Sequence, residues 1–141
     1  MPSTFTPNLR IELQATGENT NTWGTIANTN FGSLLEQAIS GYVSIAMSDA
    51  NLTLSTSQGA SDQARNMFVR LTGTLSTTRD VIVPQVSKIY GVKNDTTQSV
   101  VVKMPTGTGV TLLSGSPWTL LMSDGTNIQA LSITGNIIDK A

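Results

Sequence analysis

The sequence predicts a mainly β protein with one helix near the N-terminus. Across residues 43–134, short apolar or alternating segments are separated by turns rich in Gly, Pro, Asn and Asp. Turn signals at roughly every 8–12 residues are typical of sandwiches and barrels. One earlier stretch has apolar residues at helical spacing instead. We therefore expect an antiparallel β-sandwich or jelly-roll-like domain of about eight short strands with one N-terminal helix.

The helix is expected within Thr16–Tyr42, where start and stop signals agree with the apolar spacing. Thr20, Asn21 and Thr22 can each cap a first turn, and Gly41 is placed to end the helix in a left-handed conformation. A capping box at Ser33–Glu36 leaves a later start, near Ser33, open. The apolar stripe is expected to pack on the chain's own sheets or on a neighbouring subunit, through Trp23, Ile26, Phe31, Leu34, Leu35 and Ile39.

The chain, one compact domain of 141 residues, divides by pattern into four segments. Residues 1–15 form an arm or an ordinary first strand, because Leu9, Ile11 and Leu13 alternate with polar residues after two prolines. The capped helical segment covers 16–42, the β-domain covers 43–134, and 135–141 form a tail that is either a last strand or an arm. The alternating or apolar runs predict strands at residues 42–47, 51–55, 66–73, 81–83, 88–93, 98–104, 110–113, 118–122 and 128–133.

Two loops have the composition of β-hairpin turns. Asn94–Thr97 separates two strongly β-prone runs, and Asp124–Asn127 separates two more. We therefore expect each loop to join a pair of antiparallel neighbours.

The composition excludes several kinds of chemistry. There is no His and no Cys, so thiolate or imidazole nucleophiles and zinc sites with nitrogen or sulfur ligands are impossible. The nine acidic residues form no paired motif, and most lie where turns favour Asp. Pro105–Gly109 lacks the Lys and the helix of a phosphate-binding loop. We expect no enzymatic activity, no cofactor and no metal.

Charge and hydropathy also limit the partners. The net charge is −1 and the basic residues are scattered, so nucleic-acid binding is not expected. No apolar run resembles a membrane span or a signal peptide, and we expect no membrane partner. Charged residues make up 12% of the chain, about half the usual share, and charge is depleted at the centres of interfaces. This favours a subunit covered by copies of itself, although a secreted neutral β-domain would have a similar composition.

Several segments resemble, in the same order, small structural proteins of tailed bacteriophages that are usually described as tail-fibre or other virion proteins. The segments are Thr16–Gly24, Asn28–Asn30, Leu34–Ile39, Ala64–Met67, Val81–Pro84 and Asp124–Asn127. The resemblance covers most of the chain and implies a non-enzymatic virion component, assembled in the bacterial cytoplasm. It implies tail, portal-vertex or capsid subunits as partners, besides copies of the chain itself; a homotrimer is our expectation by analogy with fibres. A capsid decoration (cement) or head-fibre protein is the alternative within this class.

A carbohydrate-binding module that recognises a host surface glycan is a second alternative. It predicts exposed aromatic residues, Trp118 and Tyr90 among them, near loops that would contact a receptor. The candidate receptor-loop residues are Asp95, Thr106, Asp124 and Asn127. The structural interpretation instead requires the apolar helix stripe to be covered, chiefly by other chains. A stripe bare to solvent, or a cleft holding paired carboxylates, would count against it.

Overall fold

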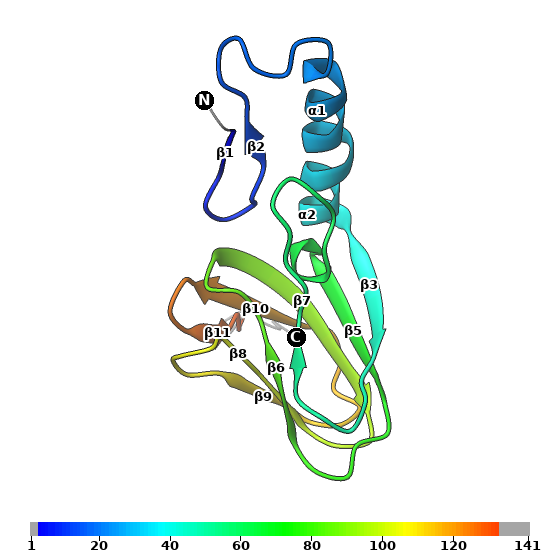
Figure 1. Ribbon diagram of the computed structural model, residues 1–141. Coiled ribbons are helices and arrows are strands. Elements are labelled where there is room, and N and C mark those ends of the chain that lie inside the picture. The colour runs from blue at the N-terminus through cyan, green and yellow to red at the C-terminus, as the bar shows by residue number, and fades with distance from the viewer. Residues whose placement is uncertain (1–2, 133–141) are drawn as a thin grey trace, which may run out of the picture.

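The computed structural model describes residues 3–132 and confirms a mainly β chain. A five-stranded sheet has the order β11-β10-β7-β5-β3, and a four-stranded sheet has the order β4-β6-β8-β9. A small hairpin and one long helix lie at one end, above the two sheets (Figure 1). The five-stranded sheet contains β3 (Tyr42–Ala46), β5 (Phe68–Gly73), β7 (Ser87–Thr96), β10 (Thr119–Asp124) and β11 (Ile128–Ala130); the other contains β4 (Leu52–Thr53), β6 (Arg79–Ile82), β8 (Val100–Lys103) and β9 (Val110–Leu112).

The expectation of antiparallel sheets is wrong for half of the strand pairs. The β3–β5, β5–β7, β4–β6 and β6–β8 pairs are parallel, and the other four pairs are antiparallel. The chain crosses to the opposite sheet after every strand from β3 to β7, and β8 is then followed by β9 in the same sheet. Up to β8, two successive strands of one sheet are therefore separated by a strand of the other sheet, and they run in the same direction.

This crossing also overturns one of the two predicted hairpins. Asn94, Asp95 and Thr96 of the predicted loop belong to β7 itself, and β7 and β8 lie in different sheets, so the two strands are not neighbours. The buried Asn94 side chain turns the chain there: its Nδ2 donates to the carbonyl oxygens of Gln98 and Leu112, and its Oδ1 accepts from the backbone N–H and the hydroxyl of Thr96. The second predicted hairpin is confirmed, because β10 and β11 pair antiparallel across Asp124–Asn127.

One hydrophobic core lies between the two sheets. Side chains alternate along each strand, so one residue in two points inward. The five-stranded sheet contributes Val69, Leu71, Tyr90, Val92 and Leu121 to this core; the four-stranded sheet contributes Val81, Val100, Val102 and Leu112. Each fully buried side chain of this size contributes roughly 1.5–3 kcal/mol to folding.

The helix is continuous from Trp23 to Ser40. It consists of α1 (Trp23–Thr29), a π-helical turn (Asn30–Leu35) and α2 (Glu36–Ser40). The start near Thr22 is confirmed and the alternative start near Ser33 is wrong. Thr22 occupies the N-cap position without capping by its side chain; its hydroxyl instead donates to the carbonyl oxygen of Asn19.

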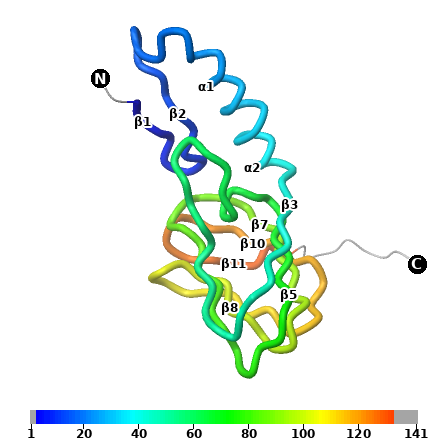
Figure 2. Tube along the Cα trace, turned by 45° about the vertical axis from the view of Figure 1, so that its right-hand side comes forward, coloured from blue at the N-terminus to red at the C-terminus, as the bar shows by residue number. Residues whose placement is uncertain are grey.

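The N-terminal segment forms a hairpin of its own rather than joining either large sheet. β1 (Thr4–Phe5) pairs antiparallel with β2 (Glu12–Leu13), and Figure 2 shows this hairpin alongside the helix. The buried Asn30 connects the two: its Nδ2 donates to the carbonyl oxygen of Glu12, and its Oδ1 accepts from the Glu12 backbone N–H. The predicted tail, residues 135–141, lies outside the described residues.

Gly41 ends the helix, but for a different reason from the predicted one. Its φ is −63° and its ψ is 140°, an extended conformation that leads directly into β3, so the left-handed ending is wrong. The need for glycine is spatial. A Cβ at this position would overlap the backbone carbonyl oxygen of Gln37 and the side-chain oxygen of Asn66.

A matched pair of alanine substitutions tests this spatial argument. Gly41→Ala should lower the free energy of unfolding by about 1–3 kcal/mol, because backbone would have to shift to admit the methyl group. Gly24→Ala should leave it unchanged or raise it by up to about 1 kcal/mol, since a Cβ there meets nothing within 4 Å and alanine favours the helix. Urea denaturation measures both. Equal effects of the two substitutions would contradict the argument.

Candidate assembly surface

The outer face of the five-stranded sheet has an apolar part that no segment of residues 3–132 covers. Register places Tyr42 beside Phe68, Phe68 beside Gly91 and Gly91 beside Leu120, all on this face. The neighbouring positions of the same face are mixed: some are apolar, whereas Ser44, Arg70, Lys93 and Gln129 are polar. We call the apolar set the outer face: Tyr42, Phe68, Ile89, Gly91, Trp118, Leu120, Met122 and Leu131.

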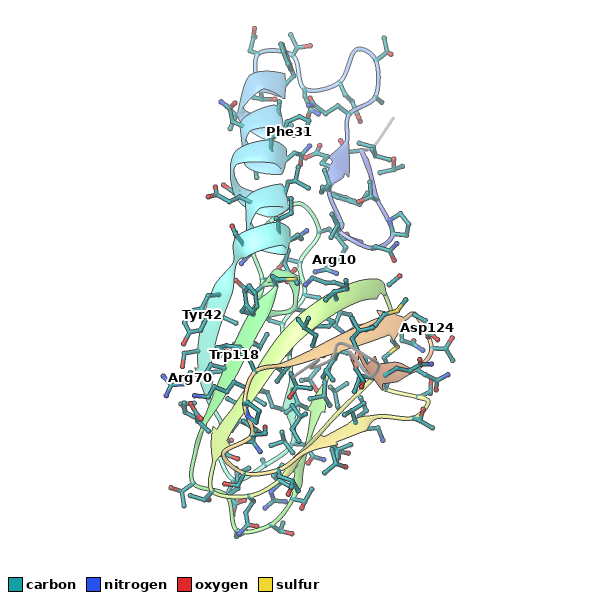
Figure 3. All side chains as sticks on the ribbon, turned by 180° about the vertical axis from the view of Figure 1, so that it is seen from behind. Arg10, Phe31, Tyr42, Arg70, Trp118 and Asp124 are labelled. Carbon is teal, nitrogen blue, oxygen red and sulfur yellow. The ribbon has the colours of Figure 1, made fainter. Side chains whose placement is uncertain are left out.

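Three aromatic rings form the part of this face nearest the helix (Figure 3). The ring of Trp118 contacts Tyr42 and Phe68 edge-on, with centroid separations of 6.1 and 5.7 Å. Gly91 makes the arrangement possible, because a Cβ there would clash with the Phe68 ring. Phe68 therefore lies across β7 and reaches Trp118, the residue directly before β10. Edge-on pairs of this kind add about 0.5–1.5 kcal/mol beyond area burial.

The other part of the outer face is aliphatic. Ile89, Leu120 and Met122 are each more than 40% exposed. A shallow depression is lined by Trp118, Thr119, Leu120, Leu131 and Ser132. No described segment of the chain fills it.

The helix presents a second exposed apolar group. Leu34 is fully buried and Ile26 and Leu35 are half-buried, whereas Trp23, Phe31 and Ile39 are 65%, 71% and 66% exposed. Packing of these last three residues on the chain's own sheets is therefore excluded. The stripe is bare at these three residues, which is the outcome that counts against the structural interpretation unless another chain covers them. No other part of residues 3–132 does so.

The two groups adjoin, because Ile39 lies three residues before Tyr42 at the passage from α2 to β3. Eleven large hydrophobic residues are exposed within residues 3–132, and nine of them belong to the helix group or the outer face. The remaining two are Leu13 and Leu113. Contiguous exposed apolar patches on soluble proteins mark interaction sites, whereas scattered single residues need no explanation.

Charged residues border the outer face at one end. Asp95 accepts a hydrogen bond from Arg70 Nε at 2.6 Å, and Lys93 Nζ lies 3.3 Å from the same carboxylate. The Arg70 hydrogen bond lowers the pKa of Asp95, and the same bond raises the pKa of Arg70. The pairs are partly exposed, so solvent screens both of them.

The structure separates the predicted receptor-loop residues. Asp124 and Asn127 share one loop, which meets the Thr106–Gly109 turn: Asn127 Oδ1 accepts from the backbone N–H of Thr108. Thr106 itself accepts a hydrogen bond from Gln85. Asp95 lies at the other end of β7. Asp124 pairs in register with Ser87, and Asp95 follows Ser87 by eight residues, which places Asp95 about 26 Å from Ser87 along the strand.

Each of these residues has a structural role in the chain. Asp124 accepts hydrogen bonds from the backbone N–H groups of Thr126 and Asn127, which lower the pKa of Asp124 and stabilise its turn. Of the two aromatics predicted near the loops, Trp118 is 45% exposed and Tyr90 is fully buried. Tyr90 is therefore closed to a ligand, whereas Trp118 is accessible.

The outer face was missed by sequence reasoning, but a signal for it exists. Two predicted strands carry large apolar residues on both faces, with Ile89 next to Tyr90 and Leu120 next to Leu121. A half-buried strand should alternate apolar and polar residues. A strand with large apolar residues on both faces is expected to be covered on both, and no segment of residues 3–132 covers the outer face of these two strands.

A buried ion cluster fixes the hairpin to the sheets. Arg10, at the start of the segment leading into β2, donates from Nη2 to Asp62 Oδ2 at 2.8 Å and from Nε to the Ser57 carbonyl oxygen. Asp62 also accepts from Arg65 and from the Ser57 backbone N–H. Arg10 adopts a φ of 53°, a left-handed conformation that costs about 1–2 kcal/mol. These contacts offset that cost and join segments about fifty residues apart.

Lys88 and Tyr90 extend this cluster into β7. The Lys88 ammonium lies 4.2 Å from the centroid of the Tyr90 ring and donates to the carbonyl oxygens of Asn66 and Ile89. Burial lowers the pKa of Lys88 to about 8, assisted by the charges of Arg10 and Arg65. Burial raises the pKa of Tyr90 above its ordinary value. Sequence patterns give no sign of this cluster, because its members are far apart in the chain.

Comparison with protein-family models, with curated proteins and with solved structures finds no match for this chain. Within residues 3–132, no group of three or more carboxylates is arranged to hold a metal ion. Over the same range, every helix is too short or too polar to cross a bilayer.

The lowered pKa of Lys88 predicts a specific pH dependence of stability. An unfolded lysine titrates near 10.5, so between about pH 8 and 10 the unfolded chain binds more protons at this position than the folded chain. The free energy of unfolding should therefore rise with pH across this window, once the charged ammonium no longer has to be buried. Tyr90 acts in the opposite direction only near the top of this window, because an unfolded tyrosine titrates near 10 while burial keeps the folded phenol protonated.

Denaturant titrations from pH 7 to 10 at constant low ionic strength measure this slope. Lys88→Met should flatten it, whereas Lys103→Met, at a half-buried lysine of the other sheet, should preserve it. A wild-type stability that falls steadily between pH 8 and 10 would contradict the buried, charged state of Lys88.

Proposed function

We propose that this chain is a non-enzymatic structural subunit of a tailed-phage virion that acts by homo-oligomeric assembly. The observation that carries the proposal is the exposed apolar surface formed by Trp23, Phe31 and Ile39 on the helix together with the outer face. A second copy of the chain is the occupant we assign to this surface. The N-terminal resemblance to tailed-phage structural proteins supports the virion as the setting.

Energetics favour covering this surface in an assembly. Burial of each large apolar side chain contributes roughly 1.5–3 kcal/mol, and only part of the sum is needed to offset the cost of association. The surface has a helical part and a sheet part along the long direction of the molecule (Figure 1). A homotrimer would bring three such surfaces around one axis, with the helices and the outer faces turned inward.

We regard the two sheets as a β-sandwich body and the helix with its hairpin as a projecting unit that carries part of the interface. A tail-fibre or tail-associated position suits this elongated shape best. A capsid decoration or head-fibre position is the alternative, and it would use the same surface. In either position the partners are tail, portal-vertex or capsid subunits, in addition to the copies of the chain.

Host-glycan recognition is a second candidate, and the exposure of Trp118 favours it. An exposed indole can stack on a sugar ring. The edge-on contacts of Trp118 with Tyr42 and Phe68 suit an interface equally well, and Tyr90 is not available to a ligand. A glycan array separates the two functions. Glycan binding by the wild-type chain would support recognition if Trp118→Ser abolishes it at a concentration where the variant keeps the wild-type oligomeric state.

The assembly proposal predicts that single substitutions on the surface dissociate the oligomer. Phe31→Ser and Trp118→Ser should each raise the dissociation constant by at least about tenfold, because each removes an apolar side chain from the interface. Phe31 is exposed in the single chain, so Phe31→Ser should change its unfolding free energy little, whereas Trp118→Ser should lower it because the edge-on contacts with Tyr42 and Phe68 are lost. Sedimentation equilibrium over a range of concentrations measures the constant.

Leu113→Ser is the matched control, since Leu113 is 67% exposed but follows β9 in the other sheet. It should leave the oligomer intact. A wild-type chain that stays monomeric at about millimolar concentration, or a control that dissociates as readily as the two variants, would refute assembly through this surface.

The virion setting has a separate test. Antibodies raised against the chain should label gradient-purified particles of the phage that encodes it, and electron microscopy should place the label on the tail. Label on the shell would support the decoration alternative. Purified particles that lack the chain would refute a virion role while leaving homo-oligomeric assembly as a property of the molecule.

A further inference from the structure

The strand β3 forms one edge of the five-stranded sheet and lacks the features that protect an edge. It pairs with β5 on one side, and no strand of residues 3–132 pairs with its other side (Figure 1). Natural sheets protect such edges with charged side chains, prolines, bulges or very short strands. The five residues of β3, YVSIA, include no charge and no proline, and their register with β5 is unbroken.

The other edges of the two large sheets are shorter within residues 3–132. β9 and β11 have three residues each, and β4 has two. In a strand, only every second residue directs its backbone groups to a given side. These edges therefore offer one or two residues to an added strand, and β3 is the edge that such a strand would pair with best.

Hydrogen bonds at the two ends of β3 show which backbone groups face its free edge. The carbonyl oxygen of Gly41 accepts from the Phe68 N–H at 2.9 Å, and the Met47 N–H donates to the carbonyl oxygen of Thr72 at 2.8 Å. Because bonding to one neighbour alternates along a strand, the odd-numbered residues from 41 to 47 bond to β5. The remaining residues direct their N–H and C=O groups away from β5: Tyr42, Ser44 and Ala46.

The same three residues are open to solvent. Tyr42, Ser44 and Ala46 are exposed, whereas Val43 is half-buried and Ile45 is buried. Backbone N–H and C=O groups are strong hydrogen-bonding groups, and a row of them along an edge is a template for another strand. The free edge of β3 is therefore both accessible and unpaired within the described chain.

We propose that this edge pairs with the β3 edge of a second copy of the chain, antiparallel about a two-fold axis at Ser44. The strand selects its own copy in two ways. It is uncharged, so two copies do not repel each other. Rotation about Ser44 also places Tyr42 of each copy opposite Ala46 of the other, so that a large side chain meets a small one.

The backbone groups match in this arrangement as well. The two Ser44 residues lie directly opposite and exchange both of their N–H···O=C bonds, and each Tyr42 does the same with an Ala46. The contact is isologous, the commonest type in soluble oligomers. It joins two five-stranded sheets into one and sets the aromatic part of both outer faces on the same side, since Tyr42 belongs to that part.

This contact goes beyond the proposed function, because it uses backbone groups at a sheet edge and not the side chains of the helix and the outer face. It does not depend on a virion setting. A closed assembly that contains the two-fold contact has an even number of copies, whatever the apolar surface adds to it.

Ser44→Pro tests the edge while leaving the ladder with β5 in place. Proline has no N–H to donate to the second copy, and it is tolerated in edge strands where the N–H points away from the sheet. Sedimentation equilibrium of the full chain should show half as many copies per assembly as in the wild type. The circular dichroism spectrum should keep its β character.

Thr111→Pro is the matched control, at an exposed residue in the centre of the edge strand β9. The carbonyl oxygen of Lys103 accepts from the Val83 N–H, so the odd-numbered residues of β8 bond to β6. Val100 and Val102 therefore bond to β9, and the Thr111 N–H, between their partners, points outward. This variant should keep the wild-type number of copies.

A disulfide cross-link provides a second readout that needs no proline. The chain has no cysteine, so a single introduced thiol can join only two copies. Residues that exchange both bonds have Cα atoms about 5.5 Å apart, which a disulfide spans. Mild oxidation of folded Ser44→Cys should give a covalent dimer on a non-reducing gel, and Thr111→Cys should stay monomeric.

Three results would overturn the proposal. One is a wild-type chain that is monomeric up to about millimolar concentration, or that assembles in an odd number of copies. Another is a folded Ser44→Pro variant that keeps the wild-type size. The third is cross-linking of Ser44→Cys that is no greater than that of Thr111→Cys.

Discussion

The core between the two sheets requires each strand to bury one face, and the chain meets this requirement by crossing to the opposite sheet after every strand from β3 to β7. Each crossing places consecutive apolar segments on opposite sides of the same core. Parallel pairing within each sheet follows from this path, because strands of one sheet recur after a complete circuit. Asn94 supports one of these crossings. Its buried side-chain amide donates hydrogen bonds to backbone carbonyl oxygens where the chain leaves one sheet for the other.

The inward-pointing side chains fill the core, so the outward-pointing side chains of each sheet are not needed for it. On the five-stranded sheet part of this outward side is apolar, and Gly91 admits the Phe68 ring so that three aromatic residues meet. The helix adds Trp23, Phe31 and Ile39, and it is held to the hairpin through Asn30 and Glu12. Polar contacts thus hold the helix and the hairpin together, while apolar side chains of the helix and of the outer face stay exposed. That division of roles is expected of a subunit whose fold is completed by its neighbours.

The junction between the projecting unit and the sheets differs in character from both. It is polar, buried and cationic, with Arg10, Asp62 and Arg65 at its centre. Removing one partner from such a cluster costs more than the pair contributes, because the remaining charge stays buried. The orientation of the helix relative to the outer face therefore depends on electrostatics, whereas the sheets depend on packing.

The sequence by itself determined the mainly β character, one helix within Thr16–Tyr42, most strand positions and the Asp124–Asn127 hairpin, and left the start of the helix open. These depend on local periodicity and turn chemistry, which act over a few residues. It also excluded imidazole and thiol chemistry by composition. Only the tertiary structure decided which strands pair, which face of the helix is covered and where Arg10, Arg65 and Lys88 meet. Those outcomes depend on contacts between residues dozens of positions apart, and no local pattern records them.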